Sequence, residues 1–269
     1  GAIVGRFNHF LAIDWSGAKA RGGRGAIALA EVVGGEVARL DASLDRDAAM
    51  RAVMETPEDG STMVALDFAF SLPRWYLRER GLRRPTQLWR TLVKDDAFGA
   101  ESLIARCDPP FWGRPGKPRP HEPELGFRRA DRLHGAKPVF QLGGAGSVGT
   151  GTLRGMPYLL DLRASGWSIW PFDPPSDRVV VEMYPARLYR HVGIERVRKA
   201  SPDSRREALR KLTAGPLSKK HRDLAIASEH AFDAVTAALA LWRLAGDREV
   251  EFPVPDALER VEGMIFQPE

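Results

Sequence analysis

Three carboxylates interrupt apolar runs of this chain, at places where a charge is costly to bury unless it is paired or binds a metal. Asp14 lies in HFLAIDWS, Asp67 in STMVALDFAF and Glu182 in RVVVEMYP. Each run has the length and composition of a buried strand. Because the carboxyl ends of parallel strands meet at one edge of a sheet, we expect the three side chains to converge. Their mutual repulsion favours a hard divalent cation held by oxygen ligands.

A fourth carboxylate, Asp233, lies in the stretch EHAFDAVTAALALWRLAG, which predicts a helix over 229–246. Glu229 and His230 share its face near the start of that helix. His230 is a candidate proton carrier or metal ligand because its pKa is close to neutral. Its alternative role is that of a histidine satisfied at a helix end, and the alternative to the whole metal site is an inert network of ion pairs with arginines.

The elements that must position these residues follow from hydrophobic periodicity and turn signals. The opening third predicts three strands joined by hairpins, one helix and a fourth strand, and the end of the chain returns to strands and a helix. We therefore expect a mixed α/β domain. The predicted strands are 9–16, 25–33, 36–42, 61–70, 167–172 and 178–185, and the predicted helices are 45–56, 73–80, 85–106 and 229–246.

Positive charge is concentrated in two stretches of a chain whose formal net charge is +5. Residues 73–137 hold fifteen Lys and Arg against eight Asp and Glu, and residues 187–223 hold twelve against four. Such stretches suit a polyanionic partner. The first is also rich in Trp and Pro, and we predict an insertion subdomain over 73–166 within a single domain that spans 1–269.

Four blocks in order along the chain, LAIDWSGAK, VALDFAFSLP, VVVEMYPARLYR and EHAFDAVTAALAL, resemble the motifs of the domain-of-unknown-function 429 family. That family is a group of predicted RNase H-like nucleases, and the H-x-x-D-A of 230–234 is similar to the last motif of RuvC-type Holliday-junction resolvases. The resemblance implies an RNase H-like mixed sheet flanked by helices, with the insertion between its fourth and fifth core strands. It also implies that Asp14, Asp67 and Asp233 bind metal, with Glu182 as a fourth ligand.

The fourth ligand is the point at which the two resemblances differ. Resolvases usually take it from the final helix, where this chain has Glu229 or His230, whereas the 429 family pattern points to Glu182. The resemblance leaves open whether Glu182 binds the metal or supports the site from behind.

The expected activity is hydrolysis of a phosphodiester in a nucleic acid or nucleotide, with Mg²⁺ or Mn²⁺ as cofactor and two ions in the site. Asp14 is the candidate bridge between the ions because the first strand is central in this fold. The remaining expectations concern contacts with the substrate. The candidates for phosphate contact are Lys19, Arg128, Arg129, Arg132 and Lys137, and the candidate for stacking on a base is Trp112.

Three other functions compete with this one. A non-catalytic module that binds nucleic acid or protein would keep the fold without the reaction. An actin-like phosphotransferase is suggested by D-x-S-G at Asp14, although such enzymes need two domains of this kind. Gly144, Gly146 and Gly149 fit G-x-G-x-x-G, but a dinucleotide-binding loop also needs a preceding strand and an acidic residue about 20 positions later.

Composition excludes several other classes of protein. The single Cys107 rules out an intramolecular disulfide or a multi-cysteine metal centre and favours a reducing compartment, so we expect a cytoplasmic protein. No apolar run approaches the roughly 20 residues needed to span a bilayer, and the N-terminal residues lack the pattern of a signal peptide. We expect no membrane association, and the sequence is silent on oligomeric state.

Overall fold

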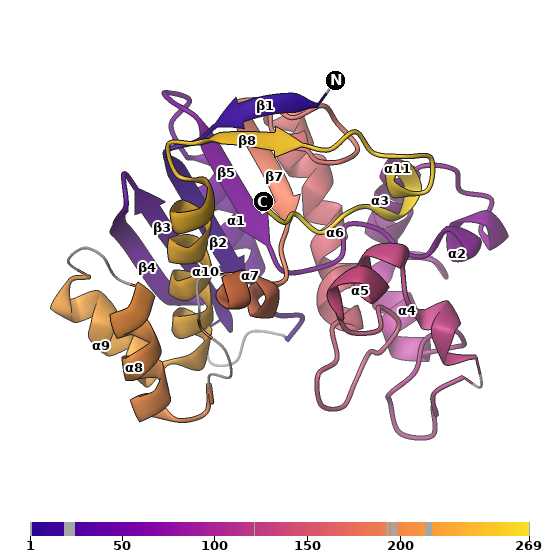
Figure 1. Cartoon of the computed structure of the whole chain (residues 1–269). Helices are drawn as coiled ribbons and strands as arrows, with labels where there is room; N and C mark the ends of the chain where they lie inside the picture. Colours follow the sequence, from indigo (N-terminus) through magenta and orange to yellow (C-terminus); the bar gives the residue numbers. More distant parts are fainter. Residues whose placement is uncertain are drawn as a thin grey trace.

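The core of the fold is a mixed sheet. The computed structural model describes residues 2–18, 25–120, 122–191, 194, 198–212 and 217–268. Among these residues, the sheet has the strand order β4-β3-β2-β5-β7-β6 (Figure 1). Its strands are β2 (His9–Asp14), β3 (Ile27–Val33), β4 (Glu36–Leu44), β5 (Thr62–Leu66), β6 (Ser168–Ile169) and β7 (Arg178–Glu182).

The two halves of the sheet differ in strand direction. β2, β3 and β4 are antiparallel neighbours, and Gly34 and Gly35 connect β3 to β4 with positive φ angles of 57° and 87°. Glycine adopts such angles without steric cost, which is why the pair Gly-Gly marks this hairpin in the sequence. β5, β7 and β6 run parallel to β2. The predicted strands are thus present, although β5 ends at Leu66, four residues before the expected end.

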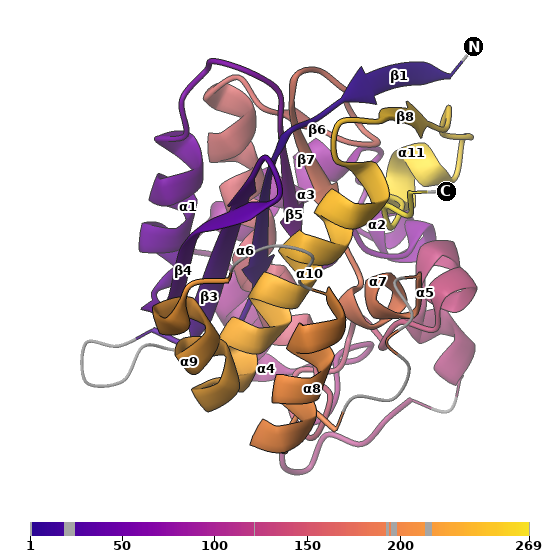
Figure 2. The same cartoon turned by 60° about the vertical axis from the view of Figure 1, so that its left-hand side comes forward.

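Helices cover both faces of the sheet (Figures 1 and 2). α10 (Glu229–Ala245) crosses the first face together with α7 (Pro185–His191), α8 (Pro202–Leu212) and α9 (Lys219–Ala227). The second face is covered by α1 (Arg46–Met54), α3 (Pro85–Val93), α4 (Ala100–Arg106) and α6 (Gly149–Ala164). The outer elements are α2 (Arg74–Glu79), the 3₁₀ helix η1 (Pro123–Gly126), α5 (Arg129–His134), α11 (Glu259–Glu262) and the antiparallel pair β1 (Ile3–Arg6) and β8 (Glu249–Phe252).

Alternation along each strand divides the buried residues into two cores. On β2, Phe10 and Ala12 belong to the core beneath α10, whereas Leu11 and Ile13 belong to the core on the opposite face. Successive side chains of a strand point to opposite faces, so the position of a residue in this alternation decides which helices it meets. The same alternation determines which of the carboxylates at the strand ends come together.

The segment between β5 and β6 shares the second core. Buried residues of α2, α3, α4 and α6 pack in one cluster with β2, β3 and β5. The predicted helix over 85–106 is two helices, α3 and α4. α6 was not expected, because its sequence contains three glycines. Two of them permit close packing: a Cβ on Gly155 would lie 2.9 Å from the Phe68 ring, and Gly151 lies against the backbone at Gly17.

The glycine-rich stretch that leads into α6 lacks the context of a dinucleotide-binding loop. Residues 139–142 form a turn and an isolated bridge between Gln141 and Trp112 instead of a strand. The G-x-G-x-x-G match is therefore not preceded by the strand that this motif requires. Within the described residues, no helix combines the length and the apolar character needed to cross a membrane.

Candidate metal and catalytic site

Asp14 and Asp67 lie side by side at the carboxyl ends of two neighbouring parallel strands. Asp14 is the last residue of β2, and Asp67 directly follows β5, whose Leu66 pairs with Ile13. Both carboxylates continue the alternating row that holds Ala12 and Ala65, so both point toward the face covered by α10. The predicted convergence of these two residues is therefore present.

Asp67 is half-buried, accepts a backbone hydrogen bond and lies close to two other acids. The backbone N–H of Trp15 donates to Oδ1 of Asp67 at 2.5 Å. Burial raises the pKa of Asp67 well above its usual range, and the neighbouring charges of Asp14 and Asp233 raise it further. The carboxyl group at this position is thus short of compensating positive charge.

Asp233 reaches the same place from α10. Its Oδ1 lies 2.9 Å from Nζ of Lys199 and 3.1 Å from the hydroxyl of Tyr189. Burial raises the pKa of Asp233, Lys199 opposes that shift, and the nearby Asp14 adds to it. Tyr189 is buried, its pKa is raised by burial and by Asp233, and it therefore acts as a hydrogen-bond donor.

His230 lies in the first turn of α10 and contacts Asp14. Its Nδ1 is 2.6 Å from Oδ2 of Asp14, and this hydrogen bond raises the pKa of the imidazole. The helix begins here because the side chain of Ser228 accepts a hydrogen bond from the N–H of Ala231, which satisfies one of the free donors at the helix start. The exposed fraction of the His230 side chain is 55%, so solvent reaches the ring.

The donor set of Asp14, Asp67 and Asp233 has the chemistry of a Mg²⁺ or Mn²⁺ site, since such cations prefer carboxylate oxygens. In the arrangement seen here, His230 and Lys199 each engage one of these carboxylates. In the described ranges, no three His, Cys, Asp or Glu side chains surround a point that could hold a metal ion. The three carboxylates fit such a cation by the chemistry of their oxygens.

Glu182 lies apart from the other three carboxylates, which corrects its predicted place in the metal site. Glu182 is the last residue of β7 and pairs with Leu66 of β5. Leu66 is the residue before Asp67, so Glu182 and Asp67 are offset by one position. Because side chains alternate, this offset of one residue turns Glu182 to the opposite face of the sheet. There its two carboxylate oxygens accept hydrogen bonds from the guanidinium of Arg128 at 2.5 and 2.9 Å, and the N–H of Phe70 donates to one of them at 3.2 Å.

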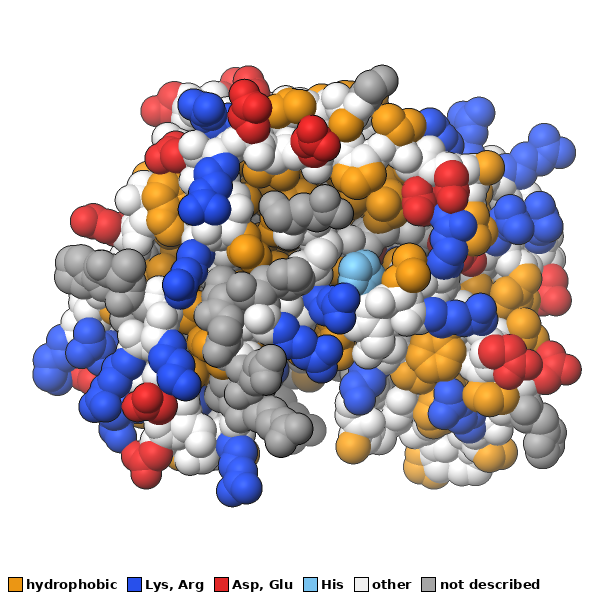
Figure 3. Space-filling model, viewed as in Figure 1, with side chains coloured by type: hydrophobic (Ala, Val, Ile, Leu, Met, Phe, Trp, Pro, Cys, Tyr) orange, Lys and Arg blue, Asp and Glu red, His pale blue; other side chains and the backbone are white. Residues whose placement is uncertain are grey.

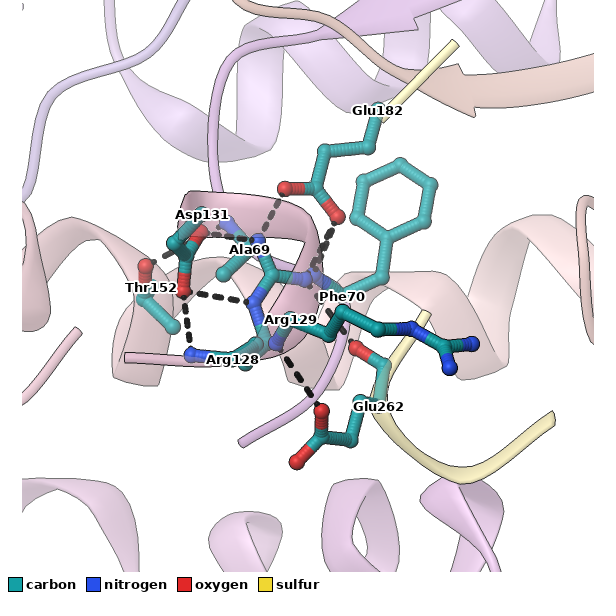
Figure 4. Close-up of polar contacts among 8 residues, drawn as sticks. All are labelled: Ala69, Phe70, Arg128, Arg129, Asp131, Thr152, Glu182 and Glu262. Carbon is teal, nitrogen blue, oxygen red and sulfur yellow. Dashed lines mark hydrogen bonds and ion pairs between the residues drawn. The ribbon is translucent and has the colours of Figure 1, made fainter. Parts of the chain in front are cut away.

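Arg128 is an internal residue, which contradicts its predicted contact with phosphate. Its exposed fraction is 1%, and its guanidinium is shared between Glu182 and Asp131 (Figure 4). Burial alone would lower the pKa of Arg128, but the two carboxylates outweigh it and raise that pKa well above its ordinary value. Arg128 Nη1 also donates to the backbone oxygen of Glu262 at 3.1 Å, so the network connects α5, β7 and α11.

The other predicted phosphate contacts have different surroundings. Arg129 is paired with Asp256 at 2.5 Å and with Glu259 at 3.1 Å, which leaves its guanidinium engaged within the protein. Arg132 is exposed and donates to the backbone oxygen of Glu124. Lys137 is exposed, and Lys19 lies outside the described residues. In the view of Figure 3, Lys and Arg side chains lie on both sides of a hollow in the molecular surface. The hollow separates the part of the surface over α8 from the part over α5.

Trp112 and residues of η1 line a cavity of about 390 Å³. Its lining includes Trp75, Phe140 and several prolines of the 109–138 segment, together with Glu79 and Glu122. The guanidinium of Arg119 lies 5.3 Å from the centre of the Trp112 ring. An apolar cavity with aromatic walls and a nearby cation suits a flat ligand. Trp89, in contrast, is fully buried in the second core.

Sequence reasoning missed two residues that contact the acids, Lys199 and Tyr189. Lys199 is one of many basic residues in the 187–223 stretch, and nothing in its immediate sequence sets it apart. Tyr189 belongs to the motif block VVVEMYPARLYR, whose period after Pro185 is helical. A helix that directly follows β7 would have placed Tyr189 near the strand ends.

Comparison with known proteins relates the second half of the chain to one family. The model of the family described as "Protein of unknown function (DUF429)" matches residues 152–257. No curated protein and no solved structure matches the chain. The matched range contains the two later motif blocks, with Glu182 and Asp233, and begins after the blocks of Asp14 and Asp67. The match confirms, over residues 152–257, that the chain resembles the domain-of-unknown-function 429 family.

Proposed function

We propose that this protein is a metal-dependent phosphodiesterase that acts on a nucleic acid or a nucleotide, with Asp14, Asp67 and Asp233 as metal ligands. The observation that carries the proposal is the convergence of these three carboxylates beneath α10. Three buried or half-buried acids repel one another, and the contacts with Lys199 and His230 offset that repulsion only in part. A divalent cation would supply the missing charge.

The strand order supports an RNase H-like core for the same function. β2, β3 and β4 form the antiparallel half, β5 and β7 form the parallel half, and α10 crosses the face onto which the acids open. In this reading, β5 and β7 are the fourth and fifth core strands and β6 is a short addition at the edge. Residues 73–166 are then the insertion that meets the substrate.

The side chains around the acids have separable roles in the proposed reaction. Mg²⁺ or Mn²⁺, bound as a pair, would activate a water molecule and stabilise the leaving oxygen. Asp14 is the candidate shared ligand because its charge acts on both Asp67 and Asp233. His230 holds a proton at Nδ1 against Oδ2 of Asp14, and its exposure allows the ring to exchange that proton with solvent or a leaving group. Tyr189 donates to Asp233 and orients it.

The substrate contacts in this proposal come from exposed side chains of α5 and the loop after it, and from the cavity that Trp112 lines. Arg132 and Lys137 are exposed and remain candidates for phosphate contact, whereas Arg128 is excluded by its burial. Trp112, with Arg119 close to its ring, is the candidate for stacking on a base. Basic side chains supply affinity for the backbone of a nucleic acid without selecting its sequence.

A cleavage screen with a matched variant tests this function. Single-stranded, duplex, hybrid and junction substrates are incubated with the protein and Mn²⁺, and the products are separated by length. Asp67→Asn keeps the shape of the side chain and removes a ligand charge, so we expect it to abolish cleavage. Asp95→Asn changes an exposed aspartate of the loop between α3 and α4 and should cleave at the wild-type rate.

The outcomes separate the candidate functions. Cleavage that survives in Asp67→Asn contradicts the assigned site. Tight binding without cleavage, in wild type and in Asp67→Asn alike, supports a non-catalytic binding module instead. Cleavage that depends on Mn²⁺ and is lost only in Asp67→Asn supports the phosphodiesterase.

A further inference from the structure

Lys199 engages both oxygens of the Asp233 carboxylate. Its Nζ lies 2.9 Å from Oδ1 and 3.1 Å from Oδ2. Among the described residues, the only other side chain that donates a hydrogen bond to this carboxylate is Tyr189, through its hydroxyl. The ammonium therefore covers the side of Asp233 through which a cation would approach both of its oxygens.

The backbone around Lys199 is anchored, so this contact is not that of a loose surface lysine. Arg205 is buried and donates to the backbone oxygen of Lys199. Its Nε also donates to the backbone oxygen of Ile226 at 2.9 Å, which connects the segment before α8 to the end of α9. The Lys199 ammonium further lies 5.6 Å from the centre of the Tyr189 ring, within the range of a cation–π contact.

The Lys199 side chain can nevertheless move away from Asp233. Its exposed fraction is 33%, so the ammonium can move into solvent without crossing the core. A single positive charge at Asp233 and a divalent cation at the same oxygens repel each other, and the divalent cation binds the larger number of carboxylates. Binding of the ion and retention of the Lys199 contact are thus linked equilibria that oppose each other.

We propose that Lys199 is a built-in counter-cation of the acidic site, which holds Asp233 in the metal-free protein and exchanges with a divalent cation there. The inference rests on the proposed function. Once displaced, the ammonium stays tethered beside the site and becomes a positioning residue for the phosphate of the substrate. Lys199 therefore weakens metal binding and strengthens substrate binding, two opposite effects of one side chain.

The test measures Mn²⁺ affinity directly, from the electron paramagnetic resonance signal of the free ion. We expect Lys199→Met to lower the Kd for Mn²⁺ by about tenfold, a typical size for coupling between two binding events. Lys199→Arg retains the charge and should keep the Kd near that of wild type. The matched control is Lys219→Met, which removes an exposed lysine paired with Asp223 at 2.8 Å on α9.

Two further readouts separate this role from a merely structural one. Without metal, Lys199→Met should unfold at a lower temperature than wild type, and saturating Mn²⁺ should remove that difference. At saturating Mn²⁺, the variant should raise KM for the cleaved substrate and change kcat less. Lys199→Gln, which keeps a polar side chain, serves if the Met variant does not fold.

An unchanged Kd in Lys199→Met and Lys199→Gln overturns the inference while the metal site stands, provided that Asp67→Asn still weakens Mn²⁺ binding. If neither wild type nor the Lys199 variants bind Mn²⁺, the inference and the proposed function both fail. Tighter binding in Lys199→Met that disappears in Lys199→Met/Asp233→Asn supports the inference.

Discussion

Nδ1 of His230 lies 2.6 Å from Oδ2 of Asp14, across 216 positions of sequence. The contact joins the first turn of α10 to the end of β2, the central strand between the antiparallel and the parallel half of the sheet. Because the hydrogen bond raises the pKa of His230, the imidazole holds its proton more firmly than an isolated histidine would. This relationship makes His230 the best placed group to carry a proton in the proposed reaction.

Replacement of His230 by Gln should separate proton transfer from metal binding. We expect kcat to fall by about 100-fold, the lower range for loss of a general acid or base, with the Kd for Mn²⁺ unchanged. Steady-state kinetics and Mn²⁺ titration measure the two quantities. A parallel loss of Mn²⁺ affinity would show that His230 is a ligand and that its role as proton carrier is wrong.

Glu182→Gln should lose stability and keep the metal site. The substitution leaves the buried Arg128 with one carboxylate partner instead of two, which we expect to cost about 3 kcal/mol in the free energy of unfolding. Chemical denaturation measures this loss. The rise in melting temperature on addition of Mn²⁺ should remain as in wild type, since Glu182 faces the other side of the sheet. Disappearance of that rise would return Glu182 to the metal site.

Arg128→Met should make stability strongly dependent on pH. The variant buries two carboxylates, those of Asp131 and Glu182, without a cation. Burial already raises the pKa of Glu182 in the wild type, and loss of Arg128 would raise it further above the value in the unfolded chain. Such a group stabilises the folded state while it is protonated, and that stability is lost as the pH rises through its folded pKa.

The expected deficit of Arg128→Met relative to wild type is therefore about 3–5 kcal/mol near neutral pH, and smaller toward about pH 4. Denaturation curves over this pH range, with Arg78→Met as the control for an exposed arginine of α2, provide the measurement. A deficit that does not change with pH would mean that packing, and not charge, explains the loss.

Trp112→Ala should weaken substrate binding without affecting the reaction centre. Stacking of one base on an aromatic ring contributes about 1–3 kcal/mol, so we expect KM to rise by about 5-fold or more with kcat nearly unchanged. Leu133→Ala is the control, because Leu133 is 65% exposed and does not line the cavity. Equal KM values in wild type and Trp112→Ala would exclude the cavity as a base-binding site.

The sequence was sufficient to predict the strands of the six-stranded sheet, although not the pair β1 and β8. It also predicted that Asp14, Asp67 and Asp233 lie near one another, because a lone acid in an apolar run has few stable roles. The sequence was not sufficient to predict the face of the sheet to which Glu182 points. β7 is apolar on both faces, so its alternation is invisible in the sequence, and an error of one position in register reverses the face. Arg128 was misplaced for a related reason: arginine is usually exposed, and only the fold brings Asp131 and Glu182 to it.

The helices around the insertion were harder to predict than the sheet. The glycines of α6 oppose helix formation locally, and the helix exists because Gly151 and Gly155 let it pack closely against Gly17 and Phe68. Lys199 contacts Asp233 from a segment whose backbone accepts a hydrogen bond from the buried Arg205. Such contacts depend on tertiary packing and leave little periodic signal in the sequence.

The proposed metal site can be tested by diffraction from crystals soaked in Mn²⁺, measured at a wavelength at which manganese scatters anomalously. We predict an anomalous peak beneath the start of α10, within roughly 2.0–2.3 Å of carboxylate oxygens of Asp14 and Asp67, with Asp233 turned from Lys199 toward the ion. Absence of a peak there while Mn²⁺ is bound elsewhere, for example beside Glu182, would contradict the assignment of Asp14, Asp67 and Asp233 as metal ligands.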